Sequence, residues 1–331
     1  MRKIIFAVCC LALFAGFAAC KKQPEQAKKI IIAVIPKGST HEFWKSIHAG
    51  AIKASRELNV DIIWKGPLKE DDREAQIKVV EDLVSRGVSG IVLAPLDDTA
   101  LRPSVANAKN SGIPVVLVDS GLKSEDYISF VATDNYKGGH MAGEYLCKLL
   151  NGKGKAIMLR CMVGSASTLE REAGWLDAIK DCKDIQVMSD NQYGGITTES
   201  AYEVGENLLS RFKNPDGSLQ IDGIFASNES TTFGMLRALQ DGGWAGKVHF
   251  VGFDSSTKLI EALSAGQLDG LILQNPFQMG YWGVKTIVAY LNKQPIEKRV
   301  DTGETLVTKE NMDKPEIKEL LAPDLKKWLN E

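Results

Sequence analysis

The chain has 331 residues, of which 44% are hydrophobic and 25% are charged, and its formal net charge is −2. These proportions are ordinary for a globular protein, and a charge so close to zero argues against nucleic acid or an anionic membrane surface as a partner. Because a single hydrophobic core stops growing near about 250–300 residues, the length favours two lobes.

The first residues have the order of an export signal. A basic Met-Arg-Lys is followed by an apolar run over residues 4–14, and small residues then lead to Cys20. This order is typical of a lipoprotein signal over residues 1–20, with Cys20 as the lipidated residue; plain secretion and an uncleaved anchor are the alternatives. The apolar run is shorter than the roughly 20 residues of a membrane span. We expect residues 21–29 to be a flexible tether and the protein to be extracytoplasmic, in the periplasm or at the cell surface, anchored through the lipid on Cys20.

The first half of the remaining chain alternates apolar runs with amphipathic stretches. The pattern predicts strands at 29–35, 61–65, 90–94, 114–118 and 128–132, and helices at 42–58, 72–86 and 99–110. Continuous apolar runs separated by helices indicate parallel strands that are covered on both faces.

A second series of the same kind begins near residue 135. Helices are predicted at 135–150, 167–180, 198–211, 229–241, 256–265 and 276–291, and strands at 155–160, 185–190, 223–226, 248–253 and 270–274. A last amphipathic stretch at 316–329, interrupted by Pro323, is expected to be a packed terminal helix, with partner docking as the alternative. Two similar halves predict an α/β protein with two doubly wound parallel-sheet lobes.

Three of the six cysteines belong to the first twenty residues, so Cys147, Cys161 and Cys182 remain. An odd number argues against a disulfide framework. One pair, for example Cys147 with Cys182, stays open in an oxidising compartment. We expect all three to be small buried hydrophobic residues.

Polar and aromatic side chains follow the predicted strands, at the edge where doubly wound sheets bind ligands. Carboxylates accept hydroxyl protons, while Arg and amide groups donate, and aromatic rings cover the C–H patches of a sugar ring. The set therefore predicts a site for a polyhydroxylated ligand. Each residue also has a structural alternative, such as a core position for an aromatic residue or a helix cap for an aspartate. The candidates are Lys37, His41, Phe43, Trp44, Asp119, Ser120, Arg171, Asn228, Phe253, Asp254 and Gln274.

Several segments occur in the order in which one known family has them. They are FWKSI at 43–47, IPVVLVD at 113–119, TDN at 133–135, GG at 138–139, EREAGW at 170–175, NE at 228–229, GMLRAL at 234–239, VGFD at 251–254, and Gln274. In these segments, which span about residues 30–310, the chain resembles the type I periplasmic sugar-binding proteins, and most of all their ribose-binding branch.

The resemblance implies a two-lobed, monomeric trap that delivers a sugar or polyol to an ABC permease and its ATPase, without a cofactor. It also implies that the chain crosses between the lobes three times, which makes a three-strand hinge. The crossings would lie near 133–134, 274–275 and 301–302, with one lobe formed by 30–133 plus 275–301 and the other by 134–274 plus 302–331.

Four positions depart from the ribose-binding pattern. Lys37 stands where that branch has a small hydroxyl residue, His41 replaces an amide, and Ser120 replaces a second Arg. The aromatic residue expected near 194–196 is absent, and Tyr193 is the candidate substitute, which adds it to the ligand-binding set. The start at 35–37 is also similar to relatives that bind the signal autoinducer-2. Another pentose, a hexose, a polyol and an acidic sugar paired with Lys37 therefore all stay open.

Other functions are weighed against this trap. A receptor module that reports a sugar or autoinducer-2 to a sensor kinase or chemoreceptor would have the same fold. An enzyme is not expected, because none of the four histidines stands in a metal or nucleophile motif, and no metal site is predicted. Asp119 and Asp254 could form the acid/base pair of a glycosidase. This alternative is disfavoured, because a nearby Arg171 would keep the carboxylates ionised and would not raise the pKa of a general acid. A sugar-responsive repressor is excluded by an export signal at the position of a DNA-binding domain.

Overall fold

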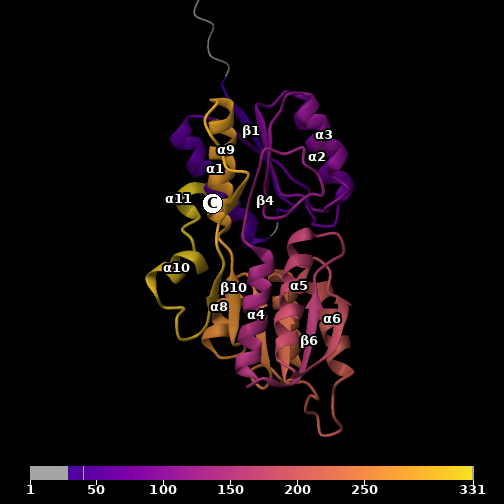
Figure 1. The fold of residues 1–331 in the computed structure, drawn as a ribbon. Coiled ribbons are helices and arrows are strands. Elements are labelled where there is room, and N and C mark those ends of the chain that lie inside the picture. The colour runs from indigo at the N-terminus through magenta and orange to yellow at the C-terminus, as the bar shows by residue number, and fades with distance from the viewer. Residues whose placement is uncertain (1–28, 40, 330–331) are drawn as a thin grey trace, which may run out of the picture.

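The computed structural model describes residues 29–39 and 41–329, so the predicted export signal, Cys20 and most of the tether lie outside the described residues. Two lobes, each a sheet flanked by helices, are stacked end to end (Figure 1). The first sheet is parallel throughout and has the order β11-β5-β4-β3-β1-β2. Its strands are β1 (Ile31–Ile35), β2 (Asp61–Trp64), β3 (Gly90–Leu93), β4 (Val115–Val118), β5 (Ser129–Ala132) and β11 (Arg299–Asp301).

The second sheet has the order β12-β10-β9-β8-β6-β7, and only β12 runs antiparallel to its neighbour. Its strands are β6 (Lys153–Arg160), β7 (Asp184–Tyr193), β8 (Gly223–Ala226), β9 (His249–Phe253), β10 (Gly270–Leu273) and β12 (Thr305–Val307). Central strands such as β8 and β10 are buried along their whole length, which explains their continuous apolar sequences.

Helices cover both faces of each sheet, so each lobe has two hydrophobic clusters. Those of the first lobe are α1 (Glu42–Leu58), α2 (Arg73–Ser85), α3 (Arg102–Asn110) and α9 (Pro276–Leu291). Those of the second are α4 (Asn135–Leu149), α5 (Ala166–Asp181), α6 (Thr198–Ser210), α7 (Glu229–Asp241), α8 (Thr257–Ser264) and α10 (Pro315–Leu321), and the short α11 (Lys326–Leu329) ends the described chain. The predicted fold of two doubly wound α/β lobes is confirmed.

The chain passes from one sheet to the other three times, after β5, after β10 and between β11 and β12. The sequence pattern predicted every longer element but missed β11 and β12, which have three residues each. So short a strand shows no alternation, and only its partner in the sheet identifies it.

The predicted single helix at 316–329 is wrong, because Pro323 separates α10 from α11. Proline has no N–H to donate and fixes its own φ, so it interrupts the helix. Ile317 and Leu321 of α10 belong to the second-lobe core, whereas α11 lies on the first lobe. Its Trp328 accepts a hydrogen bond on the backbone oxygen from Arg56 of α1, at 3.1 Å. The tail therefore packs against both lobes.

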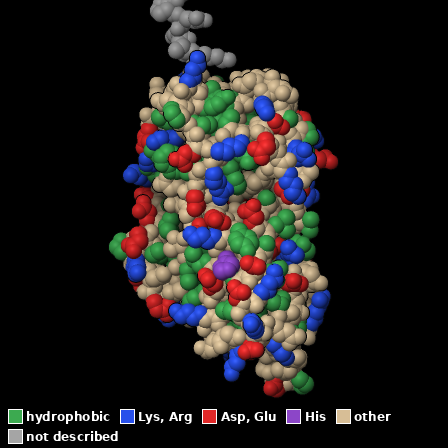
Figure 2. All heavy atoms as spheres, in the orientation of Figure 1, with side chains coloured by type: hydrophobic (Ala, Val, Ile, Leu, Met, Phe, Trp, Pro, Cys, Tyr) green, Lys and Arg blue, Asp and Glu red, His purple; other side chains and the backbone are tan. Residues whose placement is uncertain are grey.

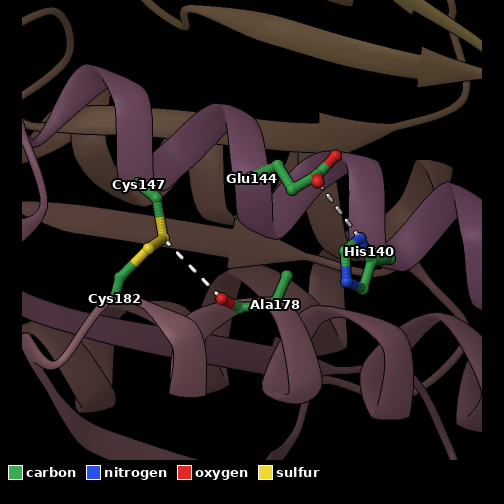
Figure 3. The surroundings of a disulfide bond; sticks show 5 residues. All are labelled: His140, Glu144, Cys147, Ala178 and Cys182. Carbon is green, nitrogen blue, oxygen red and sulfur yellow. Dashed lines mark hydrogen bonds and ion pairs between the residues drawn. A yellow bond between two sulfur atoms is a disulfide. The ribbon is translucent and has the colours of Figure 1, made fainter.

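The expectation that three cysteines are free and buried needs a correction, because Cys147 and Cys182 form a disulfide (Figure 3). The bond joins the last turn of α4 to the residue that ends α5. These helices pack at van der Waals distance: a Cβ on Gly139 would lie 1.9 Å from the backbone oxygen of Arg171, so only glycine fits there. The close packing brings the two helix ends together, which spacing in sequence does not reveal. Cys161 is free and buried, as expected.

The surface carries charges of both signs. Figure 2 shows positive and negative side chains mixed over one face, with hydrophobic side chains scattered among them. Among the described residues, no helix is both long and apolar enough to cross a membrane.

Candidate functional site

A cavity lies between the two lobes, beyond the carboxyl ends of both sheets. Its volume is about 40 Å³. The first lobe contributes side chains that follow β1, β2 and β4, and the second contributes the first two turns of α5, the start of α7 and residues after β6 and β9. The lining residues are Lys37, His41, Phe43, Trp44, Glu70, Asp119, Cys161, Met162, Ser165, Ser167, Thr168, Arg171, Asn228, Glu229 and Asp254.

Lys37 and Asp119 form a buried ion pair in the first lobe, with 2.7 Å between Nζ and Oδ2. Asp119 directly follows β4 and has a φ of 63°, a left-handed conformation that few residues other than glycine adopt. Lys37 Nζ also donates to Ser167 Oγ of the second lobe at 3.1 Å. The ammonium is therefore already neutralised by a carboxylate, which disfavours its use as the partner of an acidic sugar.

Ser120, next to Asp119, is fully buried and contacts the other lobe. Its Oγ accepts a hydrogen bond from the backbone N–H of Ser167 at 3.1 Å. Ser167 lies in the first turn of α5, where N–H groups have no partner within the helix. Ser120 thus satisfies the end of a second-lobe helix and lies behind the residues that line the cavity.

Arg171 is the buried cation of the second lobe, with 2% of its surface exposed. Its Nη1 lies 3.7 Å from Asp254 Oδ2 and donates to the backbone oxygen of Ser227 at 3.0 Å. Its Nε donates to Asn135 Oδ1 at 2.9 Å, and the guanidinium lies 3.9 Å from the centre of the Phe253 ring. Phe253 is fully buried and packs behind Arg171, so it positions this cation and does not line the cavity.

Asp254 directly follows β9 and has a φ of 66°. Its Oδ1 accepts from Gln274 Nε2 at 2.7 Å, and its Oδ2 accepts from the backbone N–H of Glu229 at 3.2 Å. Burial raises the pKa of Asp254, while Arg171 and the bond from Gln274 act to lower it. The alternative of a helix cap does not apply to this aspartate, because the N-cap of α8 is Ser256.

A second carboxylate group in the first lobe organises the aromatic side of the cavity. Glu70 Oε1 accepts from Trp44 Nε1 at 2.6 Å and lies 2.9 Å from His41 Nδ1. Burial alone would lower the pKa of His41, but the hydrogen bond with Glu70, and the charges of Glu70, Glu229 and Asp254, raise it to about 9. His41 is therefore a cation at neutral pH. Phe43 packs edge-on against Trp44, with 5.0 Å between ring centres.

Asn228 lines the cavity and also caps α7. Its Oδ1 accepts from the Thr231 backbone and hydroxyl, and its Nδ2 donates to Ser230 Oγ at 3.0 Å. Asn228 therefore has both a structural role, as the N-cap of α7, and a place in the cavity wall.

Like Ser120, Phe253 and Gln274, Tyr193 does not line the cavity, and it is the one of these four that contacts none of the lining residues described above. It ends β7 at the sheet edge, is 37% exposed, and its ring lies 5.0 Å from the Arg160 guanidinium. Gln274 is buried and reaches the site through Asp254.

Sequence reasoning missed two acids in the cavity wall, Glu70 and Glu229. Glu229 directly follows Asn228, and Glu70 lies in the loop after β2, so the strand-end rule applied to every strand would have included both. The loop after β2 holds several acidic residues, and only the fold shows that Glu70 is the one turned inward.

Three side-chain oxygens in or beside the cavity are buried without a hydrogen-bond partner among the described residues: Asp119 Oδ2, Glu229 Oε2 and Gln274 Oε1. Asp119 Oδ2 still has the Lys37 ammonium as its ion-pair partner. Buried polar atoms without hydrogen bonds are costly, so the site favours a ligand rich in hydroxyl groups. Within the described part of the chain, no group of His, Cys, Asp and Glu is arranged to hold a metal ion.

Comparison with known proteins places these features in one family. The family model described as "Periplasmic binding protein domain" matches residues 32–295. The ribose import binding protein RbsB of Escherichia coli is 28% identical over 310 residues, which cover 94% of this chain and 99% of that protein.

Two solved structures are similar over nearly their whole length. A carbohydrate transporter solute binding protein of Agrobacterium radiobacter, in complex with D-arabinose, is 31% identical with a TM-score of 0.84, covering 89% of this chain and 100% of that one. An ABC transporter solute binding protein of Agrobacterium vitis, with bound D-fucose, is 35% identical with a TM-score of 0.83, covering 88% and 100%.

Proposed function

We propose that this chain, which belongs to the periplasmic binding protein family, is an extracytoplasmic solute-binding protein that traps a sugar or sugar-like ligand and delivers it to an ABC transporter. The observation that carries the proposal is the cavity between the lobes, where carboxyl groups and cations from both lobes face one another beside two aromatic rings of the first lobe. The relatives with bound D-arabinose and D-fucose support a neutral monosaccharide or polyol as the ligand.

The proposed ligand contacts come from the cavity wall. Asp119 and Asp254 accept hydroxyl protons, while Arg171, Lys37 and the amide of Asn228 donate. Phe43 and Trp44 cover the C–H faces of the sugar, and His41 contributes a further donor. Ser120, Phe253 and Gln274 hold these side chains in position, and Tyr193 has no role in this assignment.

Closure of the lobes is the proposed trapping step. A ligand that touches both lobes binds the closed state better than the open one and shifts the population toward it. Contacts between the lobes already support closure: besides those of Ser167, the Asp98 N–H donates to the Gly164 oxygen at 2.9 Å, and Arg73 Nη2 donates to the Val163 oxygen at 3.1 Å. The loop before α5 is therefore the second-lobe surface that meets the first.

No catalytic step is assigned to the site. Each of the two strand-end aspartates is paired with a cation of its own lobe, so neither carboxyl group is free to act as a general acid or base. The proposed role is capture and release, with a permease and its ATPase as partners and a monomer as the working form.

The proposed location is outside the cytoplasm, tied to a membrane through lipid on Cys20. The Cys147–Cys182 disulfide supports this location, since such bonds persist in oxidising compartments.

The first test is a thermal-shift screen of the exported, processed protein against D-arabinose, D-fucose, D-ribose, D-allose, xylitol and a set of sugar acids. A ligand at 100 times its dissociation constant adds about 2.7 kcal/mol to the free energy of unfolding, which shifts Tm by several degrees. We expect one or more neutral sugars to give this shift and Asp119→Ala to abolish it. A folded protein that responds to none of them would overturn the proposal.

A further inference from the structure

Glu229 lines the cavity but takes part in none of the ion pairs described above. It is the first residue of α7 and lines the cavity, and its Oε2 is buried without a hydrogen-bond partner among the described residues. Its backbone is held by the bond from its N–H to Asp254 Oδ2 at 3.2 Å. The side chain therefore starts from a fixed point on the second lobe and presents an unused oxygen.

The groups that face this carboxyl are mostly acids. Asp254 lies beside it after β9, Glu42 belongs to α1, and Glu70 comes from the loop after β2. His41, before α1, is the cation that acts on it, but His41 is already paired with Glu70. The N-terminus of α7 favours a negative charge by a modest amount. Burial is the largest influence and, with the three acids, outweighs His41, so the pKa of Glu229 is raised to about 8.

The three cationic side chains of the cavity wall are paired without Glu229. Lys37 pairs with Asp119, His41 with Glu70 and Arg171 with Asp254. An ionised Glu229 would leave one buried negative charge without a counter-charge, which is costly in a poorly solvated site.

We infer that Glu229 is a specificity-determining residue of the sugar site: its carboxyl is kept as the neutral acid and donates a hydrogen bond to a hydroxyl or ring oxygen of an uncharged sugar or polyol. The inference rests on the proposed function and deepens it, because the other carboxylates of the site only accept. A neutral carboxyl supplies a donor without adding charge, so it matches a ligand oxygen that accepts a hydrogen bond.

The test compares three variants of the exported protein by calorimetric titration from pH 6 to pH 9.5, with the neutral sugar from the screen that binds wild type most tightly. Glu229→Gln keeps an uncharged donor, Glu229→Ala removes it, and Glu199→Gln is the control. Glu199 is an exposed acid in the first turn of α6, so its replacement removes the same charge from a comparable helix position outside the cavity.

For wild type and the control, we expect the dissociation constant to rise about twentyfold between pH 7 and pH 9: about tenfold as the neutral form of a group with a pKa of about 8 is depleted, and about twofold from His41. Glu229→Gln should bind within about threefold of wild type at pH 7 and lose most of this pH dependence, leaving about a twofold change from His41. Glu229→Ala should bind at least about tenfold more weakly at every pH. A Gln variant that binds as weakly as the Ala variant, or a wild-type constant that does not change with pH, would overturn the inference.

A second measurement needs no sugar. In protein labelled with ¹³C-glutamate, the carboxyl resonance that disappears in Glu229→Gln should titrate near pH 8 in the wild type. A midpoint at pH 4–5 would show an ionised Glu229 and overturn the inference, even where no sugar binds. Conversely, a midpoint near pH 8 in a protein that binds no sugar in the screen would contradict the proposed function, although Glu229 would still be shown to be a neutral acid at pH 7.

Discussion

The two lobes build the same backbone feature and use it differently. In each, a buried strand ends in an aspartate with left-handed φ, Asp119 at 63° and Asp254 at 66°. In each, the carboxylate faces a cation from its own lobe. The second-lobe pair is spaced more widely, at 3.7 Å against 2.7 Å, but its Arg171 is held from behind by Asn135, Ser227 and Phe253.

The first-lobe cation has its other contact across the cleft, on Ser167. Half of the site is therefore assembled within the second lobe, while the first-lobe half is completed when the lobes meet. A shared fold fixes where the carboxylates stand, and the residues behind them decide which half is rigid.

The helix pairs of the two lobes show a similar contrast. A Cβ added to Gly280 of α9 would lie 1.9 Å from the backbone oxygen of Ile47 in α1. A Cβ added to Gly139 in the second lobe would lie at the same distance from the backbone oxygen of Arg171, so both helix pairs are equally close. Only the second lobe adds a disulfide to its helix pair. The second lobe should therefore be the more rigid one. Two experiments test this, and two more test the ion pairs of the first lobe.

The largest effect is expected from Arg171→Met, which breaks the second-lobe assembly. It leaves Asp254 without its cation and Asn135 without its donor, so the free energy of unfolding should fall by about 3–5 kcal/mol. Urea unfolding at pH 7 measures this loss. Arg86→Met is the control, because Arg86 is exposed and pairs with Asp82 on the surface, where loss of the pair costs about 1 kcal/mol or less. Equal losses for both variants would contradict the assignment of Arg171 as an anchor.

Removal of the disulfide by Cys147→Ala with Cys182→Ala should cost about 2–4 kcal/mol, because the bond closes a long loop of the unfolded chain. Hydrogen exchange should show faster opening of α4 and α5, while α1 and α9 keep their protection. The single Cys161→Ala variant keeps the bond and should leave the exchange of α4 and α5 close to wild type. Equal loss of protection in both lobes would mean that the bond does not act locally.

Asp119→Asn should raise the dissociation constant for the sugar by about 10–100-fold, because it leaves the Lys37 ammonium buried without its counter-charge. The double variant, Lys37→Met with Asp119→Asn, removes both charges. Its loss of binding free energy should be smaller than the sum of the two single losses by about 1–3 kcal/mol. Calorimetric titration of the four proteins gives this coupling. Additive single effects would show that the pair does not act as a unit.

The smallest effect concerns His41, whose pKa is raised to about 9 by Glu70 in the folded protein. The pKa of this histidine in the unfolded chain is about 6.5. Below that pH the charged His41 makes its full contribution to the stability of the folded protein, and the contribution is lost as the pH rises through 9. The free energy of unfolding should therefore fall between pH 6.5 and pH 9 in wild type, and fall less in His41→Gln. Identical pH profiles for the two proteins would refute the pairing.

Most of the fold could be read from the sequence, because its physical signals are local. Apolar runs of strand length and amphipathic stretches gave the longer elements, and their alternation gave two doubly wound lobes. The same order placed Lys37, Asp119 and Asp254 at strand ends, where parallel sheets bring side chains together. Strands of three residues carry too few side chains for a pattern, so β11 and β12 were missed.

Tertiary structure decided which side chains meet. The Cys147–Cys182 bond depends on the packing of α4 against α5, and Tyr193 lies beside Arg160 because β7 is an edge strand. Lys37 could not be assigned from sequence to a ligand or to Asp119, and Glu229 was noted only as part of the segment at 228–229, not as a site residue. Strand and helix patterns depend on residues that are neighbours in the sequence, so the sequence alone determined the scaffold. Charge pairing, burial and protonation depend on distances between residues far apart in the chain. Only the folded chain therefore decided the electrostatics of the site.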